Sequence, residues 1–439
     1  MSTVPSTSVR SLPRVGVKAT RKATAIAFLA WMFAVYDYIL FGTLLPEISD
    51  YFGWSEATAS LVSTLVSVGT AIVALAVGPI VDRIGRRRGM ILTVSGTALA
   101  SAASAVTPGA GYLVGVRALG GLGLSEQAVN ATYLNEIYAV TEDEKIKKRR
   151  GLVYSMVQGG WPLGVLLASA FVAIFLPLVG WRGCFLLAVF PAVVIALARR
   201  GLKESPQFQL ELRMRALRKQ GRADEAATLA REHGLDEQPT APLLSIFKGG
   251  ALRNTIVLGF AWLVNWFGIQ VFSVLGTTVL TEGKQVSFTG SLVMLIVINA
   301  VGYLGYIFHG WIGDRFGRRN VIAVGWLISG VVFTLTLTVA SGTVAVVTLY
   351  SLGMFFLIGP YAALLFYMGE CYDTRCRATG TAFLNALSQP GAILAGVITT
   401  AMLASGSNWN QAALVVGAVG TFVSGLVMFA ARRVQTLEG

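Results

Sequence analysis

The sequence predicts an all-α membrane protein with twelve transmembrane helices in two pseudo-symmetric six-helix bundles. Three observations predict this fold class. Hydrophobic residues make up 54% of the 439 residues and charged residues 13%, with a mean hydropathy of +0.66, which is too apolar for a soluble chain. Apolar runs repeatedly exceed the roughly 20 residues that a helix needs to cross a bilayer. A short motif also occurs twice, and a repeated membrane half is typical of transporters.

The repeated motif closes a long apolar run in each half of the chain. Its first copy, GPIVDRIGRR, begins at Gly78, and its second, GWIGDRFGRR, begins 232 residues later at Gly310. Small residues let two helix ends approach closely, and charges make contacts that form and break during a transport cycle. The alternative to a gating role is that the arginines only anchor the membrane topology, and we prefer this interpretation for Arg87 and Arg88. The motif residues that we assign to gating are Asp82, Arg83, Arg86, Asp314, Arg315 and Arg318.

Each predicted span is justified by its own apolar run, and six runs fall in each half. We expect an N-terminal tail over 1–23, a bundle over 24–199, an amphipathic linker over 200–253, a second bundle over 254–431 and a tail over 432–439. The predicted spans cover about 24–45, 59–81, 89–107, 111–135, 151–174, 181–199, 254–280, 288–312, 320–340, 343–368, 378–402 and 408–431.

The basic residues that give the net charge of +13 follow the predicted membrane topology. All of the 35 Lys and Arg residues except Arg117, Arg182 and Lys284 fall in the tails and in every second loop. This positive-inside pattern places both termini, the linker and both motifs on the cytoplasmic side of the membrane. We expect the protein to lie in the cell (inner or plasma) membrane. The basic excess therefore indicates contact with lipid headgroups and excludes a nucleic-acid partner.

The linker carries apolar residues at three- and four-residue spacing among many charges. This pattern predicts one or two short amphipathic helices under the membrane, acting either as a solvated connection or as a latch. The three cysteines show no metal-ligand spacing and imply no disulfide. We predict neither a metal nor a cofactor. The architecture does not require more than one chain, so we expect a monomer.

Three ionisable residues lie within the spans, where a charge costs roughly 2.5–3.5 kcal/mol. They are Asp37, Arg117 and Glu126, and we assign all three to proton coupling. Arg117 and Glu126 lie on opposite sides of one helix, so each needs its own partner. If spans one and four pack together, Asp37 can pair with Arg117. A substrate anion would then compete for Arg117, and the released carboxylate would take up a proton.

Glu126 shares a face with Asn130 and Tyr133, which predicts a polar stripe facing a central cavity. The alternative for Glu126 is a structural hydrogen bond to a neighbouring helix. Other polar or aromatic residues within the spans complete the predicted substrate site. They are Tyr38, Gln158, Trp161, Asn265, Gln270, Asn299, Tyr361, Asn385 and Gln389.

With its motif repeated after spans two and eight, the chain resembles the major facilitator superfamily over nearly its whole length. Arg117 with Gly121 and Gly123 is similar to the family's second motif, whose Arg is implicated in proton coupling. Acid-to-Arg pairs at two helix ends resemble the charge-relay clusters of the sugar-porter and organic-acid symporter branches, which implies gating. These pairs are Glu136 with Arg150 and Glu370 with Arg377.

Within that family, span seven lacks the glutamine-rich sugar-binding pattern, and Trp161 interrupts the Gly-Pro motif typical of drug:proton antiporters. Tyr36-Asp37-Tyr38 and the polar residues of span four are most similar to proton symporters of carboxylic acids, which include aromatic-acid and sialic-acid carriers. The resemblance implies a proton-coupled importer of a small organic acid that works by alternating access. A proton-driven exporter of drugs or metabolites and a non-transporting sensor remain as alternatives. No nucleophile–base or metal constellation indicates an enzyme.

Overall fold

The computed structural model describes residues 12–148, 150–233, 243–372 and 377–433. The first half contains α1 (Val17–Phe52), α2 (Glu56–Ile84), α3 (Arg86–Ser104), α4 (Ala110–Ala118), α5 (Gly121–Ala139), α6 (Glu144–Lys148), α7 (Arg150–Gln158), α8 (Gly160–Leu187) and α9 (Val189–Arg200). The linker contains α10 (Pro206–Lys219) and α11 (Ala223–Glu232).

The second half begins with η1 (Leu243–Phe247), α12 (Gly249–Gly268), the π-helical η2 (Ile269–Val274), α13 (Gly276–Thr278) and η3 (Val279–Gly283). It continues with α14 (Phe288–Phe316), α15 (Arg318–Thr338), α16 (Thr343–Ile358), α17 (Tyr361–Glu370), α18 (Arg377–Ala386), α19 (Ser388–Ala404), α20 (Trp409–Ala412), η4 (Ala413–Val419) and α21 (Gly420–Met428). The described residues form no β-strand, apart from one isolated bridge between Val15 and Thr141.

Nine stretches of the described residues are long and apolar enough to cross a membrane. Two of the predicted spans, 151–174 and 181–199, form one such stretch, Val153–Arg200, in which Gly180 adopts a φ of 64° and bends the chain. The predicted spans 89–107 and 111–135 correspond to α3 and to α4 with α5, which are helical but shorter or more polar. The protein is therefore a multi-pass membrane protein, and the count of twelve spans stays a prediction.

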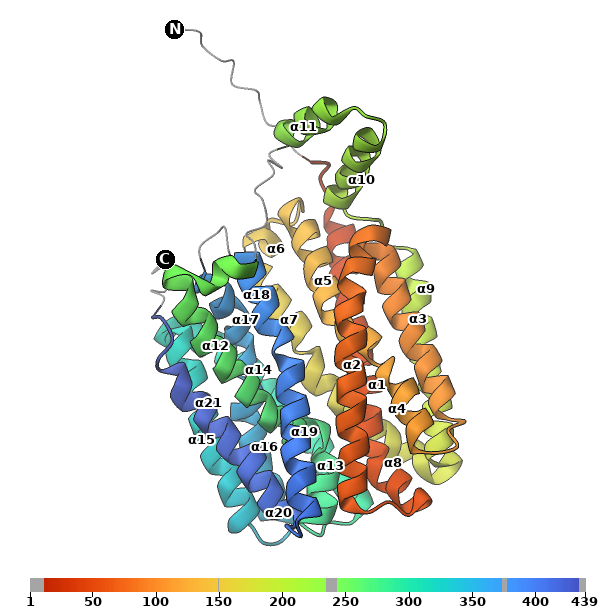
Figure 1. The fold of residues 1–439 in the computed structure, drawn as a ribbon, viewed down its shortest axis with the longest axis vertical. Coiled ribbons are helices and arrows are strands. Elements are labelled where there is room, and N and C mark those ends of the chain that lie inside the picture. Colours follow the sequence, from red (N-terminus) through yellow and green to blue (C-terminus); the bar gives the residue numbers. More distant parts are fainter. Residues whose placement is uncertain (1–11, 149, 234–242, 373–376, 434–439) are drawn as a thin grey trace.

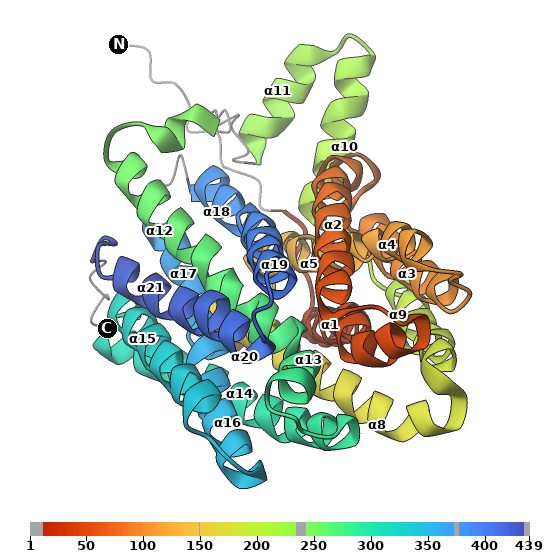
Figure 2. The same ribbon diagram turned by 60° about the horizontal axis from the view of Figure 1, so that its bottom comes forward.

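The helices of the two halves lie side by side. Figures 1 and 2 show α2 to α5 and α9 on one side and α12, α15 and α21 on the other. The most extensive contacts between them are those of α2 with α19 and of α8 with α14, and α7 also packs against α14 and α17. Gly42 lets α1 approach the second half closely, since a Cβ atom there would collide with the backbone of Val274. A space between the halves is bounded by these contacts.

The linker helices mark one end of the molecule. Figure 1 shows α10 and α11 projecting from the end at which α5, α6 and α18 also lie, and we call this the linker end. Phe208 of α10 is only 1% exposed, so the linker packs against the helices there. At the opposite end, which we call the far end, the hydroxyl groups of Ser60 in α2 and Thr400 in α19 are hydrogen-bonded at 2.8 Å. The two halves are thus in direct contact at the far end.

Candidate functional site

A cavity of about 540 Å³ lies between the two halves. Its wall is built from residues of α1, α2, α5, α7, α8, α12, α14, α17, α18 and α19. The cavity is lined by Val77 and Gly78, near the last residues of α2, and by Phe383 in α18. Figure 1 shows α18 at the linker end. Its volume lies within the range of small-molecule binding sites. The described lining residues include no Asp, Glu, Lys, Arg or His.

Aromatic side chains run along the cavity wall from one half of the protein to the other. The ring centroids are separated by 6.1 Å between Trp31 and Trp161, and by 6.0 Å between Trp161 and Trp266. Trp262 continues the series at 6.1 Å from Trp266 and 5.0 Å from Tyr361. We call these five residues the aromatic row. Such a wall favours contact with the faces and edges of another aromatic ring.

Amide side chains supply the polar part of the cavity wall. The Gln127 side-chain N–H donates to Gln158 Oε1 at 2.7 Å, and Gln158 Nε2 donates to the Tyr154 hydroxyl at 2.7 Å. Asn385 and Gln389 line the cavity from the second half, and Gln389 Oε1 has no hydrogen-bond partner among the described residues. The wall therefore offers neutral hydrogen-bonding groups to a ligand.

Five of the residues that the sequence predicts for the substrate site lie on the cavity wall. These are Gln158, Trp161, Tyr361, Asn385 and Gln389. Two others lie close to the wall: Asn265 Oδ1 accepts a hydrogen bond from the Tyr361 hydroxyl at 2.5 Å, and the Tyr38 ring lies 6.4 Å from the Trp161 ring. Gln270 and Asn299 are buried but do not line the cavity.

The predicted polar stripe of span four does not face this cavity. Asn130 donates to the carbonyl oxygen of Ala27 at 3.1 Å, and the Tyr133 hydroxyl donates to that of Lys203 at 3.0 Å. The rotation of α5 explains this correction, because Ser125 and neighbouring residues turn toward the cavity while the opposite face turns into the first half. Sequence reasoning missed Gln127, Trp31 and Tyr306, which line the cavity.

The predicted contact between Asp37 of α1 and Arg117 of α4 is present. Arg117 Nη2 donates to the Asp37 carbonyl oxygen at 2.8 Å and lies 3.4 Å from its carboxylate oxygen Oδ2. Ser101 donates to the same carboxylate. The guanidinium group also lies over the rings of Phe41 and Phe185, at 5.9 and 5.4 Å from their centroids. Both charges are thus buried and satisfied by each other and by neighbouring groups.

The predicted competition between substrate and Asp37 for Arg117 does not agree with this structure. Arg117 is only 2% exposed and does not line the large cavity. The reason is that α1 and the Phe185 ring cover the guanidinium group. A substrate in the large cavity therefore meets no cationic side chain among the described lining residues.

Glu126 has a partner that sequence reasoning missed. Its carboxylate forms an ion pair with Arg199 at the end of α9, and the side chains of both residues are 0% exposed. Arg199 also donates to the carbonyl oxygen of Met90 at 2.6 Å and to Asn130 Oδ1 at 3.2 Å. Thr93 donates to the Glu126 carboxylate at 2.6 Å. These bonds join α3, α5 and α9 inside the first half.

Asp37 and Glu126 share a second, smaller cavity of about 20 Å³. It lies among α1, α3, α5 and α9 and is lined mainly by apolar residues. A volume of this size holds about one water molecule. The two buried carboxylates of the first half therefore border the same small space, separate from the large cavity.

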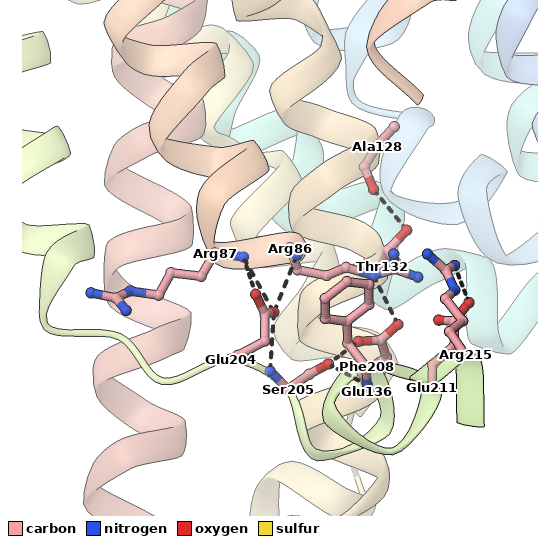
Figure 3. A network of polar contacts seen from close by, with 10 residues as sticks. All are labelled: Arg86, Arg87, Ala128, Thr132, Glu136, Glu204, Ser205, Phe208, Glu211 and Arg215. Atoms are coloured by element: carbon pink, nitrogen blue, oxygen red, sulfur yellow. Dashed lines mark hydrogen bonds and ion pairs between the residues drawn. The ribbon is translucent and has the colours of Figure 1, made fainter. Parts of the chain in front are cut away.

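The first copy of the repeated motif forms a polar cluster with the linker at the linker end. Arg86 Nε lies 3.2 Å from a Glu136 carboxylate oxygen, and Ser205 donates to the same carboxylate. Glu204 accepts the backbone N–H groups of Arg86 at 3.2 Å and Arg87 at 3.1 Å, so it caps the start of α3 (Figure 3). The cluster ties α3, α5 and the linker together.

The second copy repeats only part of this arrangement. Arg318 forms an ion pair with Glu370, in the position that Arg86 and Glu136 occupy in the first half. Arg315 lies over the Trp311 ring at 5.1 Å, and Arg83 is exposed. The side chains of four further predicted gating residues lie outside the described part of the structure: Asp82, Arg150, Asp314 and Arg377.

Comparisons with known proteins agree with this architecture. The family model described as Major Facilitator Superfamily matches residues 26–308, more than half of the chain. The chain is 24% identical to a niacin transporter of Acinetobacter baylyi over 434 residues, covering 93% of this chain and 94% of that protein. It is 28% identical to a 4-hydroxybenzoate transporter of Pseudomonas aeruginosa, with 92% and 93% covered. It is also 28% identical to a gallate transporter of Pseudomonas putida, with 87% and 85% covered.

Proposed function

The chain belongs to the major facilitator superfamily of transporters, and we propose that it imports a small aromatic carboxylate together with protons. The uncharged cavity lined by the aromatic row is the observation that carries this proposal. A flat ring gains from edge and face contacts with tryptophan, and amides can bind ring substituents. The molecules named for the three relatives, niacin, 4-hydroxybenzoate and gallate, are all aromatic rings with a carboxyl group.

Transport proceeds by alternating access between two six-helix bundles, with twelve spans in total. The contact between Ser60 and Thr400 closes the far end, and the cavity extends toward the linker end. The linker and both termini lie on the cytoplasmic side of the cell membrane. The cavity of this conformation therefore faces the cytoplasm. The opposite conformation requires the far end to separate and the linker end to close. One chain builds the whole cavity, so a monomer is sufficient for transport.

The repeated clusters at the linker end act as gates in this cycle. Arg86 with Glu136 and Arg318 with Glu370 hold each helix end within its own half. Charge-assisted contacts of this kind can exchange partners when the bundles move. The linker contact through Glu204 adds a latch to the first half.

Proton coupling is assigned to the buried acids of the first half. Asp37 can be protonated only if Arg117 keeps other acceptors, and the Asp37 carbonyl oxygen and Ser101 supply them. Tyr38 follows Asp37 in α1 and lies near Trp161 of the aromatic row. A change of charge at Asp37 can therefore shift α1 against the cavity wall. Glu126, on the same small cavity, is a second acceptor on the proton route.

Transport by purified protein in liposomes that contain a pH-sensitive dye tests the proposal. Benzoate, 4-hydroxybenzoate, nicotinate, a sugar acid and a cationic drug are added outside in turn, to wild type and to Asp37→Asn. We expect acidification of the lumen with an aromatic acid and at least a tenfold loss of that signal in the variant. No uptake of any aromatic acid would refute the substrate class. Uptake without acidification, or an unchanged variant, would refute the assigned coupling.

Two alternatives give different results in the same experiment. An exporter that exchanges protons for substrate would make the lumen alkaline when an external cation enters. A sensor would bind a ligand without any flux, so binding measured by equilibrium dialysis would persist while the dye signal stays flat.

A further inference from the structure

Two tryptophans that line the large cavity have buried indole N–H groups for which the described residues supply no hydrogen-bond partner. Trp262 and Trp266 of α12 are 6% and 7% exposed, and the nitrogen of each is buried with no acceptor in the part of the chain that the structure describes. By contrast, the N–H groups of Trp31 and Trp161 donate to protein oxygens at 3.4 and 3.1 Å. An unsatisfied buried donor is costly. Two of the four tryptophans in the aromatic row thus have an N–H donor that binds no acceptor in the described part of the protein.

Among its described lining residues, the cavity also has no cationic side chain, the group that usually binds an anion. Its described lining residues include no Lys, Arg or His, and Arg117 is held by Asp37 away from the wall. A carboxylate transferred into the cavity loses water and needs hydrogen-bond donors in return. The donors must therefore be neutral N–H or O–H groups. Trp262 and Trp266 are the lining residues whose donors are both buried and unpaired in the described structure.

We propose that the indole N–H groups of Trp262 and Trp266 bind the carboxylate of the substrate. The two residues are one helical turn apart on the same face of α12, and their ring centroids are 6.1 Å apart with an interplanar angle of 80°. This inference rests on the proposed function, because it concerns the same cavity and the same class of substrate. It adds the specificity-determining residues that distinguish an acid from its neutral analogues.

The burial of both nitrogens assigns this contact to a closed conformation. Neither nitrogen is reached by solvent in this structure, so a carboxylate reaches them only when the rings turn or the cavity wall moves around the substrate. Binding energy gained in that state favours closure, which links recognition to alternating access. Because the donors are neutral, the bound anion keeps its charge, and a second carboxylate would add a charge without a counter-ion. The site therefore selects monocarboxylates over dicarboxylates.

Four single substitutions in the full-length protein test the proposal. Trp262→Phe and Trp266→Phe each remove an unpaired N–H, whereas Trp31→Phe and Trp161→Phe are matched controls that remove paired ones from the same wall. Equilibrium dialysis measures binding of benzoate, 4-hydroxybenzoate and nicotinate, and of the corresponding amides. A hydrogen bond to a charged group corresponds to about a tenfold to hundredfold change in Kd. We expect that loss for the acids in the first two variants only, and similar small losses for the amides in all four.

A second substitution separates the N–H group from ring size. Benzothienylalanine at 262 or 266 replaces the N–H with sulfur and keeps the bicyclic ring, so it should weaken acid binding as the Phe variants do. Equal effects in all four Phe variants, or wild-type affinity with benzothienylalanine, would overturn the inference and leave the proposed function intact. If wild type binds none of the aromatic acids, the proposed function and this inference fail together.

Discussion

Replacing Arg199 with methionine should destabilise the protein more than any substitution of an exposed arginine. Arg199 and Glu126 are 0% exposed, so solvent does not screen their attraction. Two of the three donors to the Glu126 carboxylate come from Arg199, and only Thr93 remains after the substitution. Breaking a buried ion pair on one side typically costs about 3–5 kcal/mol. We expect Arg199→Met to lower the free energy of unfolding by that amount.

Three further variants distinguish the loss of the ion pair from a general loss of packing. Glu126→Gln should cost a similar amount, about 3–5 kcal/mol, because it leaves the buried charge of Arg199 with only the neutral acceptors Met90 and Asn130. The double variant Glu126→Leu with Arg199→Met buries no unpaired charge and should recover most of the loss. Arg200→Met is the matched control, since Arg200 is the next residue of α9 and is exposed. Its expected effect is within about 0.5 kcal/mol.

Unfolding in mixed micelles of dodecyl maltoside and SDS, followed by far-UV circular dichroism, measures these free energies. The reasoning is refuted if Arg199→Met lies within about 1 kcal/mol of Arg200→Met, because a buried charge left without its partner should cost several times more. It is equally refuted if the double variant is no more stable than Arg199→Met alone. That result would show that the loss comes from packing and not from an unpaired carboxylate.

The remaining predictions concern the two ends of the molecule. When Ser60 and Thr400 are both replaced with cysteine, oxidation to a disulfide should lock the far end and reduce uptake at least tenfold. A reductant should restore uptake. Undiminished uptake by the oxidised protein would contradict the proposed closure of the far end. Glu204→Ala removes the cap of α3 and should lower thermal stability by about 1 kcal/mol; an unchanged unfolding midpoint would show that the cap contributes nothing. The hydrogen bond from Arg21 lowers the pKa of Asp143 in the folded protein. The stabilisation of the fold by this bond is therefore fully present above the unfolded-state pKa of about 3.9, and it is lost as the pH falls through the lower folded-state pKa. The stability advantage of wild type over Arg21→Gln should therefore be constant from pH 8 to 5 and should shrink below about pH 4 in unfolding measurements; an advantage that changes between pH 8 and 5 would refute this assignment.

The sequence predicted the elements whose signal is local. Long apolar runs indicated helices that cross a membrane, and the repeated motif indicated charged residues at matching helix ends in both halves. The partners were not predicted: Glu136 pairs with Arg86 and Glu370 with Arg318, whereas the sequence suggested Arg150 and Arg377, whose side chains lie outside the described structure. The cost of a charge in a membrane also pointed to Asp37 and Arg117, which are in contact. These inferences succeeded because hydrophobicity and buried charge constrain each segment separately.

The partner of Glu126 shows where such reasoning stops. Arg199 and Arg200 are adjacent at the end of a predicted span, and nothing in the sequence distinguishes them. Successive residues of a helix point about 100° apart, so the rotation of α9 decides that Arg199 is buried and Arg200 is exposed. The same kind of rotation in α5 turns Asn130 away from the large cavity.

The sequence by itself determined that this protein is a helical membrane transporter with a repeated motif and with charges held inside its first half. Only the tertiary structure decided which charges pair and which side chains line the cavity. Hydropathy and charge bias are properties of one segment and can be read along the chain. The pairing of Arg199 with Glu126, 73 residues apart, depends on how helices rotate and pack against one another, and that geometry is set by the whole bundle at once.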